Sequence, residues 1–452
     1  MARGERLVLH VATDAPRFRA RFYRIGGRTV LVEESRWLAG RDAAPGRPDA
    51  DWQWPDYAFA IGREWRPGVH VAELLTPDDT PHETPDLAAS AKAALFVVRG
   101  DGGADNVSAN TVRADILYKI PLATYHAYNC TGGGCFYFAP TRSADPAGSR
   151  VTLRRPGGGI GGDTHGAADH YDATSPRQTF AHWDAPFIRW LERCGHAPDY
   201  CTDFDLHDDP ERLYGHRLLL NVGHDEYWST SMRDAVETFA ARGGNVAFFG
   251  ANVCWWRIHV VDHGSAIVCH QGGPRGALDH WWPATGANRP EDSLTGVSYR
   301  HGGGWWNGPR RSEGYIVQRP AHWAFEGTGL HAGDAFGAQT SPPLVGYECD
   351  GAPLEFDATT GVATLASDAA RSGTPEDFDV LAAAPLSREW DELPPRTGYA
   401  AGEGVHAATM GVHAPGGTVF TAGTTDWAQA LGKDACVERI TRNVIERLLR
   451  RG

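Results

Sequence analysis

The sequence lacks long hydrophobic runs and an excess of positive charge, and both absences exclude classes of protein. No stretch of about 18 apolar residues occurs, so we expect no membrane-spanning helix. The opening residues, MARGERLVLH, hold no apolar segment of signal-peptide length, which predicts a cytoplasmic protein. The 43 Lys and Arg residues are outnumbered by 56 Asp and Glu, giving a net charge of −13. This balance argues against nucleic acid as the main partner, because phosphate attracts clustered Lys and Arg.

The sequence also lacks the cysteine spacings of a structural metal site. Its eight cysteines are scattered, and no pair shows C-x2-C spacing, which favours a reduced intracellular chain. Glycine and tryptophan, by contrast, are abundant, with 54 and 16 copies. Many tryptophans form pairs, either as packing for a large core or as walls of a pocket built from loops. The pairs are Trp255-Trp256, Trp281-Trp282 and Trp305-Trp306.

The 452 residues are too many for one ordinary domain, and the sequence pattern changes near residue 105. Residues 1–105 contain short runs rich in β-branched and aromatic residues, which predicts a small immunoglobulin-like β-sandwich. Over 106–452, strand-like and helix-like segments alternate. This predicts an α/β domain with a mostly parallel three-layer sheet of the glutamine-amidotransferase-like type. Residues 260–400 have a weak pattern, and we expect a loop-rich insertion there.

The strongest candidate site is the run Gly223-His224-Asp225-Glu226-Tyr227-Trp228, which lies between a predicted strand and a predicted helix. The carboxyl ends of strands are where α/β proteins keep their sites. His224 can move protons near neutral pH, and Glu226 can bind metal or move protons. The structural alternative is that Asp225 and Glu226 stabilise the positive end of the following helix.

Two more candidates follow predicted strands. Tyr125 and Tyr128 come after a buried strand, and phenolate oxygen is a good ligand for ferric iron; alternatively, both rings serve packing. Asn252 follows the strand at 245–249, at a turn where a glutamine amidotransferase carries its catalytic cysteine. Cys254 comes two residues later, which disfavours thiol catalysis and leaves Asn252 to hold substrate or orient water.

Glu348 is the last candidate and lies in an apolar stretch, LVGYECDG. Burial there would raise the pKa of its carboxyl towards that of a general base. A solvated glutamate at the end of a strand is an equally natural interpretation.

Taken together, six motifs resemble the large (beta) subunit of N,N-dimethylformamidase and its relatives, over most of residues 108–435. The motifs, in order, are IPLATYHAYN, PFIRWLERCGH, GHDEYWS, FFGANVCWWR, LVGYECDG and VFTAGTTDW. The resemblance implies hydrolysis of the C–N bond of small linear amides by a protein with a mononuclear iron ion, as Fe3+. It also implies a separate small subunit as partner, and a homo-oligomer stays open.

Carried over by motif, the resemblance implies that Glu226 and Tyr128, with Tyr125 as the fallback, bind the iron. It also implies that His224 and Glu348 move protons beside it. Relatives carry their second tyrosine in an Arg-Pro-Tyr motif, whereas here Gly157 follows Arg155-Pro156. Either Tyr171, after the Gly-rich segment, is the replacement, or the second tyrosine ligand is absent. The rival hypothesis is a non-catalytic or carbohydrate-binding protein on the same scaffold.

Overall fold

The computed structural model describes ten segments of the chain: 1–87, 90–100, 114–137, 149–157, 159–161, 177–271, 278–306, 314–357, 359–394 and 405–450. By its internal contacts the chain divides into two compact units. The first comprises residues 1–165, 174–212 and 258–278, and the second comprises 166–173, 213–257 and 279–452. The predicted domain boundary near residue 105 falls outside the described residues and stays a prediction.

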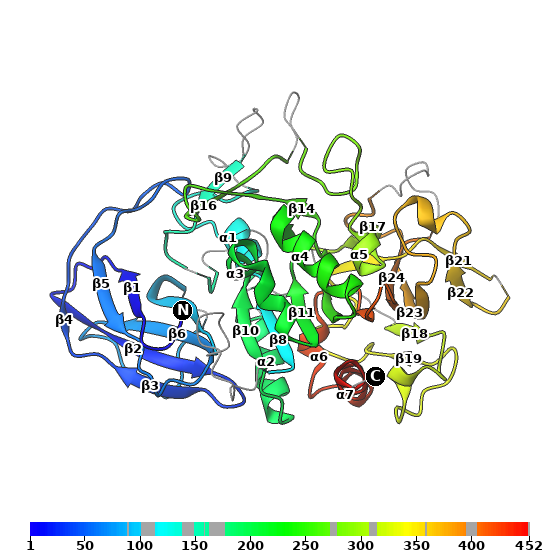
Figure 1. Ribbon diagram of the computed structural model, residues 1–452, viewed down its shortest axis with the longest axis horizontal. Helices are drawn as coiled ribbons and strands as arrows, with labels where there is room; N and C mark the ends of the chain where they lie inside the picture. The colour runs from blue at the N-terminus through cyan, green and yellow to red at the C-terminus, as the bar shows by residue number, and fades with distance from the viewer. Residues whose placement is uncertain are drawn as a thin grey trace. The chain divides into compact units, whose positions relative to one another are not determined.

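The N-terminal part of the first unit is built from two antiparallel sheets, drawn in blue in Figure 1. Buried side chains from both sheets, including Leu9, Phe22 and Phe96, form one hydrophobic cluster. Two sheets that share one core are the packing that a β-sandwich requires. The strands are β1 (Arg6–His10) with β5 (Asp56–Ala60), and β3 (Val30–Glu34), β2 (Arg17–Ile25), β6 (Gly68–Leu75) and β7 (Ala93–Val98), with β4 (Leu38–Ala39) on β2.

The rest of the first unit combines strands and helices. Its helix α2 (Asp184–Arg193) ends before Gly195, whose φ of +90° is the left-handed conformation typical of a residue after a helix. The remaining elements are η1 (Ser90–Lys92), β8 (Ile116–Ile120) parallel to β10 (Asp199–Thr202), α1 (Leu122–Tyr128), α3 (Asp203–Asp208), and the sheet of β9 (Ser149–Thr152), β16 (Ala266–Cys269) and β15 (His259–Val261).

The second unit is centred on a mixed sheet. Strands β11 (Leu218–His224), β13 (Asn245–Ala251) and β25 (Val419–Thr421) run parallel, as predicted. The next four strands are antiparallel, in the order β24 (Ala407–His413), β23 (Asp379–Pro385), β18 (Tyr315–Val317) and β19 (Ala335–Phe336). The expectation of a mostly parallel sheet is therefore wrong for this part. The physical reason is local, because β24 and β25 are joined by a short hairpin connection, which only antiparallel strands allow.

The chain is thus of mixed α/β class, and the three-layer glutamine-amidotransferase-like arrangement stays a prediction. Residues 260–400, expected as a loop-rich insertion, contribute β18, β19 and β23 to the main sheet. Further pairs in the second unit are β17 (Ser298–Gly304) with β20 (Glu348–Gly351), β21 (Leu354–Phe356) with β22 (Ala363–Leu365), and β12 (Tyr227–Trp228) with β14 (Trp256–Arg257). The helices are α4 (Thr230–Ala241), α5 (Asp292–Thr295), η3 (Trp323–Phe325), η4 (Ala369–Arg371), α6 (Trp427–Ala430) and α7 (Ala435–Leu449).

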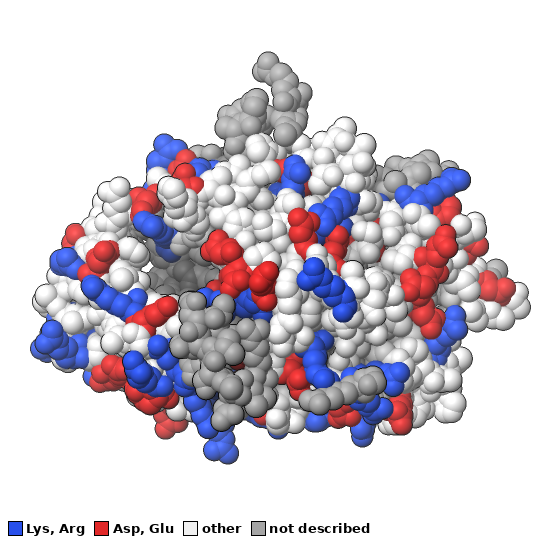
Figure 2. All heavy atoms as spheres, in the orientation of Figure 1, with Lys and Arg blue, Asp and Glu red and all other residues white. Residues whose placement is uncertain are grey.

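The described residues show how helix hydropathy and surface charge are distributed. Within them, no helix has both the length and the hydropathy that crossing a membrane would require. Figure 2 shows acidic and basic side chains interspersed over the face that it draws.

A buried ion pair between Lys119 on β8 and Asp203 on α3 lies in the first unit. Both side chains are fully buried, and Asp203 also accepts a hydrogen bond of 2.8 Å from the backbone of Ala123. We expect Asp203→Ala to lower the free energy of unfolding by about 3–5 kcal/mol, because it leaves a buried ammonium group without this carboxylate. Urea unfolding would measure the loss.

Asp208→Ala, at an exposed position of the same helix, is the control and should change stability by less than about 0.5 kcal/mol. Equal effects of the two substitutions would contradict the importance of the buried pair.

Candidate functional site

The candidate site lies where the parallel strands β11 and β13 end side by side, with His224 opposite Ala251 in register. The two backbones are in close contact here. A Cβ atom at Gly250 would collide with the carbonyl oxygen of Gly223, and Gly223 itself has a left-handed φ of +74°. Two glycines therefore allow both strands to deliver the residues after them to one edge of the sheet.

At this edge, His224 lies between two buried carboxylates. Its Nε2 atom is 3.0 Å from Oε2 of Glu348 and 3.4 Å from Oε2 of Glu226. The exposed fractions are 0% for His224, 2% for Glu226 and 4% for Glu348. Because buried carboxylates need compensating positive charge or hydrogen-bond donors, this imidazole is held in place by electrostatics as well as packing. The structure thus brings together three residues that the sequence had singled out in two separate motifs.

Asn252 completes the cluster. Its Nδ2 atom is 3.1 Å from Nε2 of His224 and 3.5 Å from Oε2 of Glu348. Its φ of +49° is a conformation that costs energy for a residue with a side chain and is typical of functional turns. Among the described residues, no partner reaches its buried Oδ1 atom. That oxygen is available to accept a hydrogen bond from water or a substrate.

The alternative role for the acids, capping of helix α4, does not describe the structure. The N-cap of α4 is Ser229, whose hydroxyl accepts from the backbone of Met232. Asp225 instead accepts a hydrogen bond from the side chain of Asn221, and its backbone carbonyl accepts one from the indole of Trp228. Asp225 therefore braces the loop, while Glu226 faces His224.

An aromatic wall borders Glu348. The indole of Trp306 donates to Oε1 of Glu348 at 3.3 Å, and the hydroxyl of Tyr299 donates to Glu392 at 3.1 Å. The ring of Trp255 packs edge-on against Tyr299, with centroids 5.5 Å apart. Two tryptophans from the paired motifs thus line this site. Trp281 does not, since it is buried under Arg233 as a packing residue.

Tyr299 and Glu392 were not expected as site residues from the sequence. Burial raises the pKa of the Tyr299 hydroxyl well above its usual range, with further contributions from Glu348 and Glu392, so it stays a neutral donor. Burial, with the charge of Glu348, also raises the pKa of the Glu392 carboxyl. Glu392 lies in an irregular loop without a sequence signal, although the nearby Trp305-Trp306 pair pointed to this region.

Asp350 stabilises the turn at Asn252 through a hydrogen bond to the next residue. Its Oδ2 atom accepts a hydrogen bond of 3.3 Å from the backbone of Val253. Burial, and then the charges of Glu291 and Glu348, raise the pKa of the Asp350 carboxyl to about 8, against a lowering by the backbone amides of Asn252 and Val253. At neutral pH it is therefore largely protonated.

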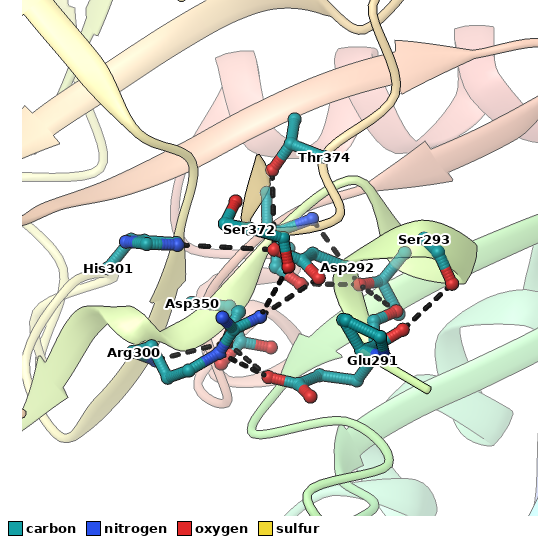
Figure 3. A network of polar contacts seen from close by, with 12 residues as sticks. Glu291, Asp292, Ser293, Arg300, His301, Asp350, Ser372 and Thr374 are labelled. Atoms are coloured by element: carbon teal, nitrogen blue, oxygen red, sulfur yellow. Dashed lines mark hydrogen bonds and ion pairs between the residues drawn. The ribbon is translucent and has the colours of Figure 1, made fainter. Parts of the chain in front are cut away.

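A buried network lies beside Asp350, as Figure 3 shows. In it, Nη2 of Arg300 is 2.9 Å from Oδ1 of Asp292, and Nε of Arg300 is 3.3 Å from Oε1 of Glu291. The same guanidinium group also donates a hydrogen bond to the carbonyl of Ser372. One guanidinium group thus compensates two buried acids behind the site. We assign this network a structural role.

Cys254 is unsuited to thiol chemistry. Its side chain is fully buried, its φ is +57°, and burial raises the pKa of its thiol. The thiol therefore stays protonated, and a thiol is a far weaker nucleophile than a thiolate. This agrees with the expectation that the turn does not carry a catalytic cysteine.

The predicted tyrosine ligands belong to the first unit or to undescribed residues. Tyr128, the last residue of α1, is 7% exposed, and its hydroxyl lies 3.2 Å from that of Tyr137. Tyr125, the fallback candidate, donates to Asp184, so its hydroxyl has a structural use. Tyr171 lies outside the described residues. Tyr137 was not expected as a ligand from the sequence, although it lies beside the Gly-rich loop after Tyr128.

Each unit by itself offers oxygen donors of the kind that suits a hard cation. The carboxylates of Glu226 and Glu348 are buried beside one imidazole, and Tyr128 and Tyr137 offer two neighbouring phenol oxygens within the first unit. Oxygen donors of this kind suit ferric iron. The set of Tyr128, Glu226 and Tyr171 as ligands of one ion stays a prediction.

Comparison with known proteins agrees with the resemblance seen in the motifs. A family model described as N,N-dimethylformamidase beta subunit-like, C-terminal, matches residues 18–439. The N,N-dimethylformamidase beta subunit of Alcaligenes sp is 32% identical over 83 residues, which is 17% of this chain and 11% of that relative. The match to the family model covers nearly the whole chain, including β2 to β7 as well as the site. The chain therefore belongs to the N,N-dimethylformamidase beta subunit-like family.

Proposed function

We propose that the chain hydrolyses the C–N bond of small uncharged amides at the cluster of His224, Glu348 and Asn252. The observation that carries the proposal is the 3.0 Å contact between Nε2 of His224 and Oε2 of Glu348 in a buried site. A carboxylate beside an imidazole makes the imidazole a better proton acceptor, which is what activation of water requires. Family membership supports amide hydrolysis as the reaction class.

The proposed chemistry uses these side chains in turn. The pair of His224 and Glu348 takes a proton from water as the water oxygen attacks the amide carbonyl carbon. Asn252 orients the water or the carbonyl group through the amide that contacts His224. When the C–N bond breaks, His224 returns the proton to the leaving nitrogen, so that the products are a carboxylic acid and an amine.

Substrate selection falls to the aromatic wall. Trp255, Tyr299 and Trp306 present apolar surfaces next to Glu348, with few polar tips. Such a surface favours small uncharged groups, for example N-alkyl substituents, over charged ones. The name of the Alcaligenes relative refers to the same kind of substrate.

We further propose that Tyr128 and Glu226 hold an iron ion, with Tyr137 or Tyr171 as the second tyrosine. Tyr137 is favoured by its hydroxyl contact with Tyr128. When bound, the ion would supply a Lewis acid for the amide carbonyl. Because the relative is named a beta subunit, a second, small subunit is the proposed partner. The cytoplasm remains the proposed compartment, in agreement with the free cysteines.

The first prediction about the proposed function concerns Glu348. Replacing it by Gln removes the negative charge beside His224 and should lower kcat for a panel of formamides and acetamides by about 10²–10⁴-fold. Amine release measures the rate. The matched control is Glu355→Gln, at an exposed position of the neighbouring strand, which should keep the rate of the wild type. An unchanged rate in Glu348→Gln would remove the proposed proton transfer.

The second prediction concerns the metal. Purified protein should contain iron by plasma emission and show a visible tyrosinate-to-iron absorption band, and Tyr128→Phe should lose most of both. Tyr214→Phe, at a tyrosine in the other unit, serves as the control and should keep iron and colour. A folded wild-type protein that takes up no iron would exclude the proposed metal site while leaving the proton-transfer cluster to be tested by activity.

The third prediction concerns Asp350 and pH. Its folded pKa of about 8 lies above the unfolded value of about 3.9, so between these pH values the folded state binds more protons. Its contribution to stability is fully present below the lower value and is lost as pH rises through the folded pKa. In Asp350→Asn, the free energy of unfolding should therefore fall less between pH 4 and 8. Denaturant unfolding across this range measures it.

The control for this experiment is Glu376→Gln, an exposed position that should keep the pH dependence of the wild type. If Asp350→Asn retained the full wild-type slope, a protonated Asp350 would be excluded.

A further inference from the structure

Two cysteines face one another across a short loop in the first unit. The Sγ atoms of Cys130 and Cys135 are 2.9 Å apart, and no disulfide joins them. Cys135 is buried and Cys130 is half-buried, so Cys130 is the more exposed residue of the pair. The C-x4-C spacing of this pair matches none of the usual metal or redox motifs, so the pair was not expected from the sequence.

The loop between them is folded for this approach. Gly132 and Gly133 have φ values of +89° and +88°, which residues with side chains rarely adopt. The amides of Gly133 and Gly134 donate to the carbonyl of Cys130, at 2.9 and 3.2 Å. These hydrogen bonds close the turn and return the chain so that Cys135 meets Cys130.

The side chain of Arg155 also holds this loop in place. Its guanidinium group donates to the carbonyls of His126, Thr131 and Gly134, at 2.7, 3.3 and 2.9 Å. Arg155 is itself 6% exposed. A buried guanidinium with three carbonyl partners holds both ends of the turn, so the approach of the sulfurs is built into the fold.

We propose that Cys130 and Cys135 are a redox modification site that forms a reversible intramolecular disulfide. With a low-molecular-weight disulfide as oxidant, Cys130 attacks one of its sulfurs and releases the first small thiol. Cys135 then attacks Cys130 and releases the second, so that two protein thiols become one disulfide and the oxidant becomes two thiols. The bond has only to close a gap from 2.9 Å to about 2.05 Å.

The position of the pair gives the disulfide a consequence. Tyr128 lies two residues before Cys130, and Tyr137 lies two residues after Cys135, with their rings 4.7 Å apart. The cross-link would restrict the segment that carries both hydroxyl groups. Only this consequence rests on the proposed function, because the disulfide itself forms whether or not the tyrosines bind iron.

The test is peptide mapping of the intact chain after incubation with oxidised glutathione, followed by unfolding and alkylation without reductant. We expect a peptide that contains both residues, lacks two hydrogen atoms and carries no alkyl label at either position. Dithiothreitol should restore both labels. Full alkylation of both cysteines, or glutathione retained on Cys130 without a cross-link, would overturn the proposal.

Variants make the assignment specific. Cys130→Ser should abolish the cross-linked peptide and leave Cys135 open to alkylation, whereas Cys436→Ser, at a half-buried cysteine of α7, should leave it unchanged. Circular dichroism shows whether each variant is folded, and the wild-type map stands without them. Iron content is measured on the oxidised and reduced wild type, so a failed metal site and a failed disulfide give different results.

Discussion

The contact on which the site depends is the one between Nε2 of His224 and the carboxylates of Glu348 and Glu226. All three side chains are buried, so none of the charges is screened by bulk water. Several elements of the second unit position these side chains. Parallel strands β11 and β13 bring His224 next to the Asn252 turn, β20 supplies Glu348, and the pair of Asp350 and Val253 holds the turn in its unusual conformation.

Much of this site could be predicted from the sequence, because its central residues directly follow strands with strong hydrophobic patterns. The run after Leu218–His224 and the turn after Asn245–Ala251 were both expected at the same sheet edge. Parallel strands deliver the residues at their carboxyl ends to one place, so a correct strand assignment is enough to unite them. Glu348 was found through its apolar surroundings.

Other parts could not be predicted, because they depend on long-range packing. Tyr299 and Glu392 are 93 residues apart and meet only when β17 and a distant loop are folded. Tyr137 follows a glycine-rich turn whose direction is set by positive φ angles that no hydrophobic pattern reports. In the fold, the antiparallel half of the sheet was missed for a similar reason. Strands such as β18 and β19 have only three and two residues, too few to show a period.

The collision that a side chain at Gly250 would make with the backbone of Gly223 limits which substitutions this protein can accept at its strand ends. The strand ends have no room for new side chains, so the reactive groups stay at a constant spacing. The wall differs, because a Cβ atom at Gly304 would collide with the side chains of Tyr299 and Trp306 rather than with backbone, so an exchange there would displace these rings and reshape the surface. Directed evolution towards bulkier amides should therefore randomise the wall and leave the strand ends untouched.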